Sequence, residues 1–333
     1  GYYASIKNSS KVIKAVARGK QKAKDCIRMA AILAGGEENL KLRPNTFTTC
    51  NVISPLQYAN EQTEGLIEYA KMGLPVDIAS EPQSGATSPV TLSGTIAQQT
   101  AEILGMIVIA QNVNPGTPVL MGTVAAAMDL HNGSIALGGV EAALMNVAHA
   151  QMAQFYKIPC RGTGSNTESK TFDAQAGYEK AITLLMPALA GINVIFYPGT
   201  MDHALAISPE GLVIDDEICG MVNRILEGIH INDDKLAIDV IDKVGPMGHY
   251  INQKHTLKYL KEEHYIPRLS DRDSLENWES KGSRDIYERA KQKVKSILEE
   301  HQPMPLDKDV DRELLRVIKE VEKRELGQEW SPT

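Results

Sequence analysis

Short apolar runs alternate with longer segments of helical periodicity through the first 246 residues of this chain. The apolar runs predict buried strands at 46–53, 74–79, 118–121, 158–161 and 193–197, with a further strand expected near 1–4. The intervening segments predict helices at 61–72, 91–112, 139–156, 173–189 and 210–228. Strands separated by helices indicate βαβ units, right-handed crossovers and a parallel sheet.

Polar or glycine-rich residues follow nearly every predicted strand. An open doubly wound sheet gathers such residues at one switch point, whereas a (β/α)₈ barrel carries them at the carboxyl end of every strand. The pattern therefore favours the α/β class and a TIM (β/α)₈ barrel. Because a closed barrel needs two more strands, we expect the barrel to be N-terminally incomplete in this chain. The start Gly1-Tyr2-Tyr3 has no initiator Met, so we expect the chain to begin inside a larger protein.

The sequence becomes charged and strongly helical after Pro246. We therefore divide the chain into a (β/α) barrel at 1–246 and a C-terminal helical extension at 247–333. Helices are predicted at 254–264, 273–281, 283–301 and 307–326. The last two carry apolar residues with a four-residue rhythm, so they predict a helical hairpin that buries its faces on the barrel or on a partner. We expect a homo-oligomer on this basis.

Composition excludes several classes of partner. The chain has 35 Lys and Arg against 42 Asp and Glu, a net charge of -7, which gives no field for nucleic acid. The four cysteines lie far apart without zinc spacing, which predicts reduced thiols in a cytoplasmic protein and no metal site. The longest apolar stretch, 103–110, is far shorter than the ~20 residues that span a bilayer, so we expect no membrane partner.

The segment 158–181, IPCRGTGSNTESKTFDAQAGYEKA, concentrates the most potential chemistry. A dinucleotide fingerprint would need glycine at 167, where the chain has Thr167. Lys170 is either a Schiff-base lysine, which requires a desolvated amine, or a solvated, ion-paired lysine, which its polar neighbours favour.

Other strand exits offer further candidates with simpler alternatives. Tyr197 either walls a pocket for a quaternary ammonium or packs at a strand end. His149 falls within an apolar helix and is expected to be a hydrogen-bonded core histidine. The basic residues of 11–24 have helical spacing and form either a solvated face or a docking patch.

Several motifs make the chain resemble a known family. They are SPL at 54–56, SGATSPVTLSG at 84–94, DAQAGYEK at 173–180, ALAG at 188–191 and LVID at 212–215. They are similar to the trimethylamine and quaternary-amine methyltransferases, which pass a methyl group to a corrinoid protein. The resemblance implies a TIM barrel and a loop, here 162–167, that carries pyrrolysine in the trimethylamine enzymes. This chain has standard residues there, with Gly164 or Ser165 expected at that place, so it looks like the non-pyrrolysine branch of the glycine betaine type.

That branch implies methyl transfer from a quaternary, betaine-like amine to Co(I). A tetraalkylammonium already carries a neutral leaving group, so no general acid is required, and catalysis rests on orientation and electrostatics. The resemblance implies no permanently bound cofactor, a corrinoid (cobalamin) presented by a cognate partner protein, and a small methylated amine as substrate.

We assign candidate residues by their place at strand exits. The catalytic candidates lie in the loop after the fourth plain strand: Gly164, Ser165 and Asn166. The substrate-binding candidates are Glu81, Gln83, Thr163, Lys170, Tyr197, Asp202 and His203. Among them Glu81, Tyr197 and Asp202 are expected to face the ammonium, and Lys170, His203 or Asn166 to anchor a carboxylate. Two other hypotheses remain: a Schiff-base lyase that uses Lys170, and a catalytically silent barrel that assembles through 283–326.

Overall fold

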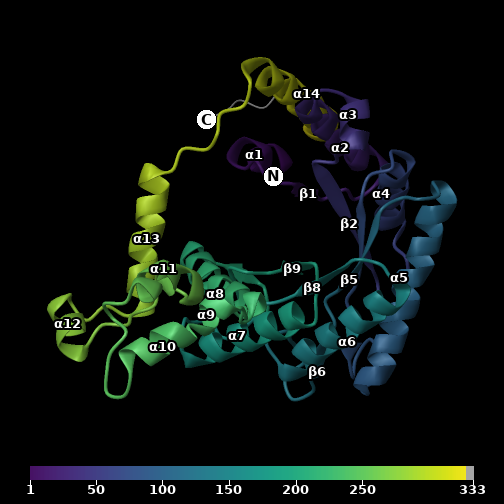
Figure 1. The fold of residues 1–333 in the computed structure, drawn as a ribbon. Coiled ribbons are helices and arrows are strands. Elements are labelled where there is room, and N and C mark those ends of the chain that lie inside the picture. The colour runs from purple at the N-terminus through teal and green to yellow at the C-terminus, as the bar shows by residue number, and fades with distance from the viewer. Residues whose placement is uncertain (328–333) are drawn as a thin grey trace.

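The computed structural model describes residues 1–327, and its centre is a six-stranded sheet in which every neighbouring pair is parallel (Figure 1). The strands are β1 (Ile13–Ala15), β2 (Thr46–Val52), β3 (Val76–Ser80), β5 (Val119–Thr123), β8 (Cys160–Thr163) and β9 (Val194–Phe196). Their order across the sheet is their order along the chain, as in the wall of a barrel rather than a doubly wound sheet. The five plain strands are confirmed to within two residues.

The predicted strand near 1–4 is wrong, because these residues begin helix α1 (Tyr2–Asn8). The sixth strand is β1, whose Ile13 and Ala15 are buried while Lys14 is exposed. A three-residue strand is too short to show period-2 alternation above a basic background. The basic residues of 11–24 consequently do not share one helical face, since helix α2 (Lys20–Ala34) begins only after this strand.

Helices cover the outer face of the sheet. They are α2, α3 (Glu37–Leu42), α4 (Asn60–Lys71), α5 (Leu92–Val113), α6 (Val140–Tyr156), α7 (Ala174–Leu189) and α8 (Pro209–Glu227). The five predicted barrel helices are confirmed as α4 to α8. The main core lies between sheet and helices, with fully buried Leu66, Tyr69, Ile78, Ile103 and Met106. This core covers one face of the sheet, and the carboxyl ends of the parallel strands lie together at one end of the sheet.

Short strands follow the main strands at the carboxyl end of the sheet and form two separate small sheets. One small sheet contains β4 (Gln83–Ser84), β6 (Ala126–Asp129) and β7 (Ser134–Ala136), and the other pairs β10 (Thr200–Met201) with β11 (Ala206–Ile207). The helix α5 is long and apolar enough to cross a membrane by length and composition alone. It packs against β3, β5, α4 and α6, which are the contacts of a core helix.

The sheet is curled into a half-barrel. The Phe196 ring of β9 lies 6.5 Å from the Phe47 ring of β2, and the Lys14 amine of β1 lies 4.8 Å from the Phe196 centroid. Side chains from the two edge strands therefore meet across the concave face, although β1 and β9 are not hydrogen-bonded neighbours. Residues 1–327 form six parallel strands, whereas a closed (β/α)₈ barrel needs eight, so the closed barrel stays a prediction.

The chain ends in a series of helices that extend from α8. They are α9 (Asp233–Leu236), α10 (Ile238–Val244), α11 (Lys254–Glu263), α12 (Leu275–Ser280), α13 (Ile286–Glu300) and α14 (Lys308–Leu326). The predicted helices at 254–264, 273–281, 283–301 and 307–326 are confirmed. The boundary at residue 246 stays a prediction.

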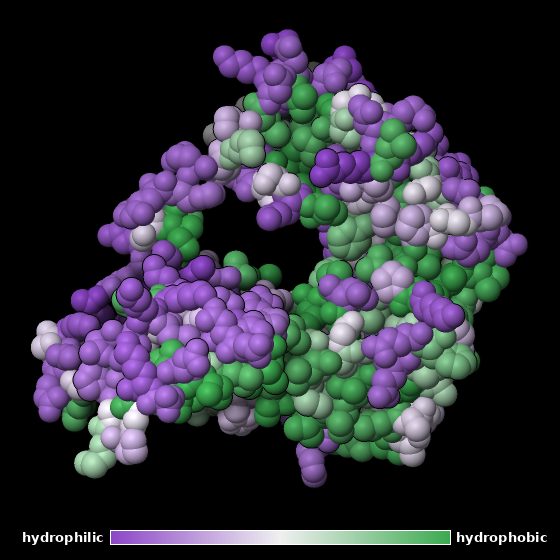
Figure 2. All heavy atoms as spheres, viewed as in Figure 1, coloured by the Kyte–Doolittle hydropathy of each residue, from purple (hydrophilic) through white to green (hydrophobic). Residues whose placement is uncertain are grey.

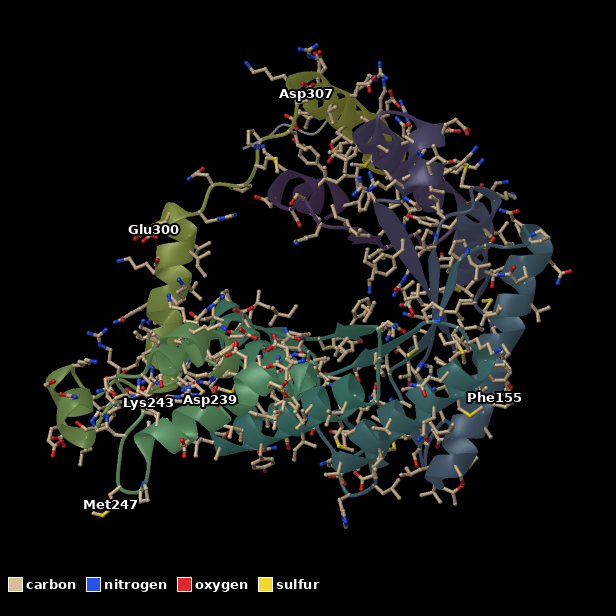
Figure 3. All side chains as sticks on the ribbon, in the orientation of Figure 1. Phe155, Asp239, Lys243, Met247, Glu300 and Asp307 are labelled. Carbon is tan, nitrogen blue, oxygen red and sulfur yellow. The ribbon has the colours of Figure 1, made fainter. Side chains whose placement is uncertain are left out.

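The predicted hairpin of α13 and α14 is wrong. Helix α13 packs against α8, where Ala290 is fully buried, and α14 packs against α2 through Leu314 and Val317. Their neighbours lie at opposite edges of the sheet, so the segment between Glu300 and Asp307 crosses the open side of the half-barrel (Figures 1 and 3). Figure 2 shows the opening that this segment borders. The apolar face of each helix packs against the half-barrel within this chain. The apolar faces of α13 and α14 therefore no longer support the predicted homo-oligomer.

Candidate active site

A buried ion pair forms the floor of the concave face. The Arg161 guanidinium of β8 donates two hydrogen bonds of 3.0 Å to Asp77 Oδ2 of β3. Thr49 Oγ1 donates to the same oxygen at 2.9 Å, and Arg161 Nη1 donates to the Thr123 carbonyl at 2.9 Å. A Cβ at Gly122 would collide with Asp77 Oδ1, so glycine on the intervening strand β5 lets the pair form.

The Phe196 ring lies close to two cations. Arg161 Cζ and Lys14 Nζ are each 4.8 Å from its centroid, a distance at which the ring face attracts positive charge. Partial desolvation by the surrounding protein, followed by the charge of Arg161, lowers the pKa of Lys14, whereas Asp77 and Glu81 oppose that change. The concave face therefore combines aromatic surface with closely spaced charges of both signs.

Glu81 and Tyr197 follow β3 and β9 and share one electrostatic neighbourhood. Surrounding protein raises the pKa of Glu81 although its side chain remains exposed to water, and the positive charges of Arg161, Lys14 and Arg18 oppose the rise. Burial raises the pKa of Tyr197, and the negative charge of Glu81 adds to this. The structure thus brings these two candidates together, beside cations that the sequence did not single out.

The loop after β8 is packed into the protein. Ser165 and Asn166 are 0% and 1% exposed, and a Cβ at Gly164 would lie 2.7 Å from Ile195. Thr163 Oγ1 accepts a 3.2 Å hydrogen bond from Asn146 of α6. Within residues 1–327, Ser165 Oγ and both amide atoms of Asn166 have no hydrogen-bond partner. The catalytic role of this loop stays a prediction, and its side chains are covered in this conformation.

A second buried ion pair fixes this loop to the exit of β9. Lys180 Nζ of α7 donates to the Ser165 carbonyl at 3.0 Å, to the Thr200 carbonyl at 2.7 Å and to Asp215 Oδ2 at 2.8 Å. Asp215 Oδ2 also accepts from the Gly199 amide. Both partners are at most 1% exposed. One ammonium therefore joins two helices and the two loops that line the mouth.

Lys170, Asp202 and His203 form a separate cluster at the outer rim. Lys170 Nζ lies 3.3 Å from Asp202 Oδ1 and 3.4 Å from His203 Nε2, and it donates to the Glu168 carbonyl at 2.8 Å. His203 Nδ1 donates to the Ile135 carbonyl at 2.7 Å. The Lys170 side chain is 65% exposed. A hydrated, ion-paired amine lacks the desolvation that a Schiff-base lysine needs, which disfavours the lyase hypothesis.

Gln83 serves the small sheet at the mouth. Its backbone amide donates to Thr87 Oγ1 at 2.9 Å, and its backbone carbonyl accepts from the backbone amides of Ala86, Thr87 and Ser88. These contacts form the turn after β4. The substrate role predicted for its side chain stays untested.

Unusual backbone conformations gather in the two loops at the mouth. Ser165 after β8, and Tyr197, Asp202, His203 and Ala204 after β9, all have positive φ between 51° and 86°. Such conformations cost about 1–3 kcal/mol each and persist where surrounding contacts impose them. Their concentration here is typical of a functional rim.

The sequence did not identify the charged residues of the floor. Arg161 lies within a run that was interpreted only as a strand, and Lys14 lies in the basic segment that was interpreted as either a solvated face or a docking patch. A charged residue inside a predicted buried strand is a usable signal, because burial of a charge requires a partner. Which carboxylate supplies that partner depends on strand order, which puts β3 two places from β8.

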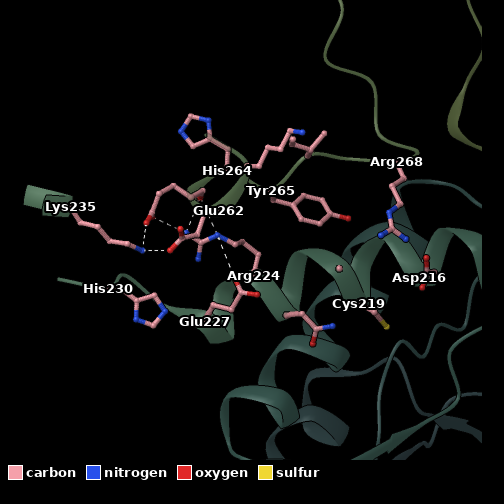
Figure 4. A pocket seen from close by; sticks show the side chains of 15 residues that line it. Asp216, Cys219, Arg224, Glu227, His230, Lys235, Glu262, His264, Tyr265 and Arg268 are labelled. Atoms are coloured by element: carbon pink, nitrogen blue, oxygen red, sulfur yellow. Dashed lines mark hydrogen bonds and ion pairs between the residues drawn. The ribbon is translucent and has the colours of Figure 1, made fainter. Parts of the chain in front are cut away.

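The pocket drawn in Figure 4 lies between α8, which belongs to residues 1–246, and α11, which belongs to the C-terminal extension. Several of its charges are paired: Lys235 contacts Glu262 and Glu263, and Arg224 Nη2 lies 3.4 Å from Glu263 Oε2. These pairs join α8 and α9 to α11. Within residues 1–327, no group of three or more His, Cys, Asp or Glu side chains is placed to hold a metal ion.

Comparison with known proteins gives consistent matches. The family model "Trimethylamine methyltransferase (MTTB)" matches residues 1–327. The chain is 41% identical to "Glycine betaine methyltransferase" of Desulfitobacterium hafniense (strain Y51), covering 98% of this chain and 68% of that protein. It is 36% identical to "Trimethylamine methyltransferase MttB" of Desulfitobacterium hafniense (strain DSM 10664 / DCB-2), covering 95% and 63%. It is 34% identical to "Trimethylamine methyltransferase MttB" of Methanosarcina barkeri, covering 88% and 59%. The chain thus spans 59% to 68% of the length of these three relatives.

Proposed function

The chain belongs to the trimethylamine methyltransferase family, and on that premise we propose that it moves a methyl group from a quaternary, betaine-like amine to the Co(I) of a corrinoid protein. The observation that carries the choice of donor is the combination of an exposed carboxylate, Glu81 after β3, with the aromatic residues Phe196 and Tyr197 at the end of β9, where the charge of Glu81 acts on Tyr197. Carboxylates and aromatic rings both attract quaternary ammonium groups. The similarity to a protein named glycine betaine methyltransferase supports the same donor class.

The proposed reaction is a direct displacement. The electron pair of Co(I) forms the bond to the methyl carbon, and the carbon–nitrogen bond breaks with its pair going to nitrogen. A tertiary amine leaves and the product is methyl-Co(III), so cobalt is formally oxidised by two electrons. No proton is transferred, because the leaving amine is neutral. The corrinoid, carried by a partner protein, supplies the nucleophile.

The task of this chain is to orient the donor. Glu81 and Tyr197 hold the ammonium at the mouth of the half-barrel, and the buried Asp77–Arg161 pair fixes the floor below it. A fixed orientation of one methyl group toward the entering cobalt lowers the barrier by removing rotational freedom before reaction. The standard residues at 162–167 fit a donor that needs no further activation.

The affinity for a quaternary amine is expected to fall as the pH is lowered toward the raised pKa of Glu81. The carboxylate attracts the cation only when ionised, and its pKa lies above the ordinary value of 4.5 because surrounding protein disfavours the charge. Attraction is therefore present above that pKa and is lost as the pH falls through it. Titration calorimetry with tetramethylammonium over a pH series measures the midpoint.

Glu81→Gln is the matched test of this assignment. It should weaken binding of tetramethylammonium at neutral pH about fivefold, which corresponds to about 1 kcal/mol for a solvent-exposed charge pair. It should also remove the fall in affinity at low pH (the acid limb of the profile). Glu279→Gln, at an exposed position of α12, should retain the wild-type profile. An unchanged acid limb in Glu81→Gln would remove Glu81 from the site.

Donor selectivity tests the proposed substrate class. The protein is incubated with a Co(I) corrinoid protein and, in turn, trimethylglycine, choline, tetramethylammonium and trimethylamine, and demethylated amines are measured by mass spectrometry. We expect product from a quaternary donor and none from trimethylamine. Product from trimethylamine alone would contradict the quaternary-amine assignment.

We also propose a cytoplasmic location. The free thiols of Cys26, Cys50, Cys160 and Cys219 support it, as does the air-sensitive Co(I) acceptor that the reaction requires.

A further inference from the structure

Lys14 extends from β1 into the concave face. In β1 the buried Ile13 and Ala15 face the helices, so the alternation of a strand directs Lys14 to the opposite side. The position of its amine, 4.8 Å from the Phe196 centroid, agrees with that direction. The side chain is exposed, so a small molecule in the concavity can reach the amine.

Lys14 also has no carboxylate committed to it. Among residues 1–327, no Asp or Glu oxygen lies within 4.0 Å of its amine. Asp77, a nearby carboxylate, already accepts two hydrogen bonds from Arg161 and one from Thr49. The other, Glu81, influences Lys14 only at longer range.

The charges around this point leave an excess of positive charge. Lys14, Arg18 and Arg161 all act on Glu81, and the acidic residues of the same neighbourhood are Asp77 and Glu81. The Arg161–Asp77 ion pair is internally balanced. What remains is one carboxylate, suited to a cation, beside lysine and arginine side chains, suited to an anion. Such an arrangement is complementary to a zwitterion.

We infer that Lys14 binds the carboxylate of a zwitterionic methylated amine whose ammonium group lies at Glu81 and Tyr197. The inference rests on the proposed function and narrows it, since it selects amines that carry a carboxylate over simple quaternary cations. The ammonium of Lys14 donates hydrogen bonds to the carboxylate, and the Phe196 ring keeps the lysine stem over the concave face.

Lys14 replaces the anchors expected from the sequence. Lys170 and His203 lie in the rim cluster, where Lys170 is already paired with Asp202. Asn166 is buried within the loop after β8. The specificity contact thus comes from the edge strand that hydrophobic patterning did not reveal.

The test compares two ligands in titration calorimetry on the full-length protein. Trimethylglycine carries the carboxylate, and tetramethylammonium offers only the cation. Lys14→Met should raise the Kd for trimethylglycine roughly 10- to 100-fold, the range for a lost hydrogen bond between charged groups, and change the Kd for tetramethylammonium less than about twofold. Lys14→Arg should retain most of the affinity for trimethylglycine, because it keeps the charge.

The controls separate binding from folding and from the proposed function. Lys319→Met, at an exposed position of α14, should leave both affinities unchanged, and thermal unfolding of Lys14→Met should match the wild type. Equal weakening of both ligands, or no effect on trimethylglycine, would overturn the role of Lys14 while leaving methyl transfer intact. Failure of every donor to methylate the corrinoid would instead overturn the proposed function.

Discussion

Asp77→Ala is expected to lower the free energy of unfolding by about 3–5 kcal/mol. The substitution leaves the Arg161 guanidinium, 3% exposed, without the carboxylate that accepts two of its hydrogen bonds. An uncompensated buried charge is among the most costly defects in a folded protein. Urea unfolding followed by far-ultraviolet circular dichroism measures the loss.

Two further variants show whether the loss of stability in Asp77→Ala comes from the unpaired charge of Arg161. Asp309→Ala removes a carboxylate from a solvent-exposed pair with Arg312, so it should leave the unfolding free energy almost unchanged. Arg161→Met combined with Asp77→Ala removes both charges and should recover part of the loss. A double variant as unstable as Asp77→Ala alone would contradict this explanation.

Lys180→Met is expected to cost a similar amount, about 3–5 kcal/mol, and to loosen both loops at the mouth. It removes the ammonium that joins Ser165, Thr200 and Asp215, and it leaves the buried Asp215 carboxylate without its cation. Urea unfolding measures the stability, and amide hydrogen exchange should show faster exchange at 164–166 and 199–201. Methyl transfer should fall with the loss of order, because the reaction depends on orientation.

Lys170→Met is the matched control for Lys180→Met. Lys170, like Lys180, comes after β8 in the chain, but its ion pair with Asp202 is exposed at the rim. Loss of that pair should therefore change the free energy of unfolding little. Equal effects of the two lysine variants would show that the Lys180 ion pair does not hold the loops.

The sequence predicted the elements best where hydrophobic patterns were long. The five plain strands and the helices α4 to α8 carry enough apolar positions to define their period. His149 was also predicted correctly: its Nδ1 lies 2.8 Å from Gln99 Nε2 and its Nε2 lies 2.9 Å from the Met121 carbonyl. An apolar helix leaves a histidine few other roles.

Features that depend on tertiary neighbours were not predicted. The strand β1 has three residues, and its identity comes from pairing with Thr46, Phe47 and Thr48. The helices α13 and α14 share the same amphipathic pattern, yet they pack on different barrel helices. Periodicity indicates that a face must be buried but not which surface covers it.

The candidate site was predicted in location more than in composition. Strand exits do line the mouth, and Glu81 and Tyr197 share a neighbourhood there. The candidates Lys170, Asp202 and His203 instead meet at the rim. Which candidates lie together depends on the order of the strands and on the direction of each side chain, and neither can be read from the sequence alone.

The central claim is methyl transfer to cobalt, and the optical spectrum of the corrinoid tests it most directly. The full-length protein is mixed anaerobically with a Co(I) corrinoid protein, and trimethylglycine is then added. The account predicts that the Co(I) absorption disappears as methyl-Co(III) forms, with one dimethylglycine released per cobalt methylated. A Co(I) spectrum that persists with trimethylglycine and with every other quaternary donor would contradict the account.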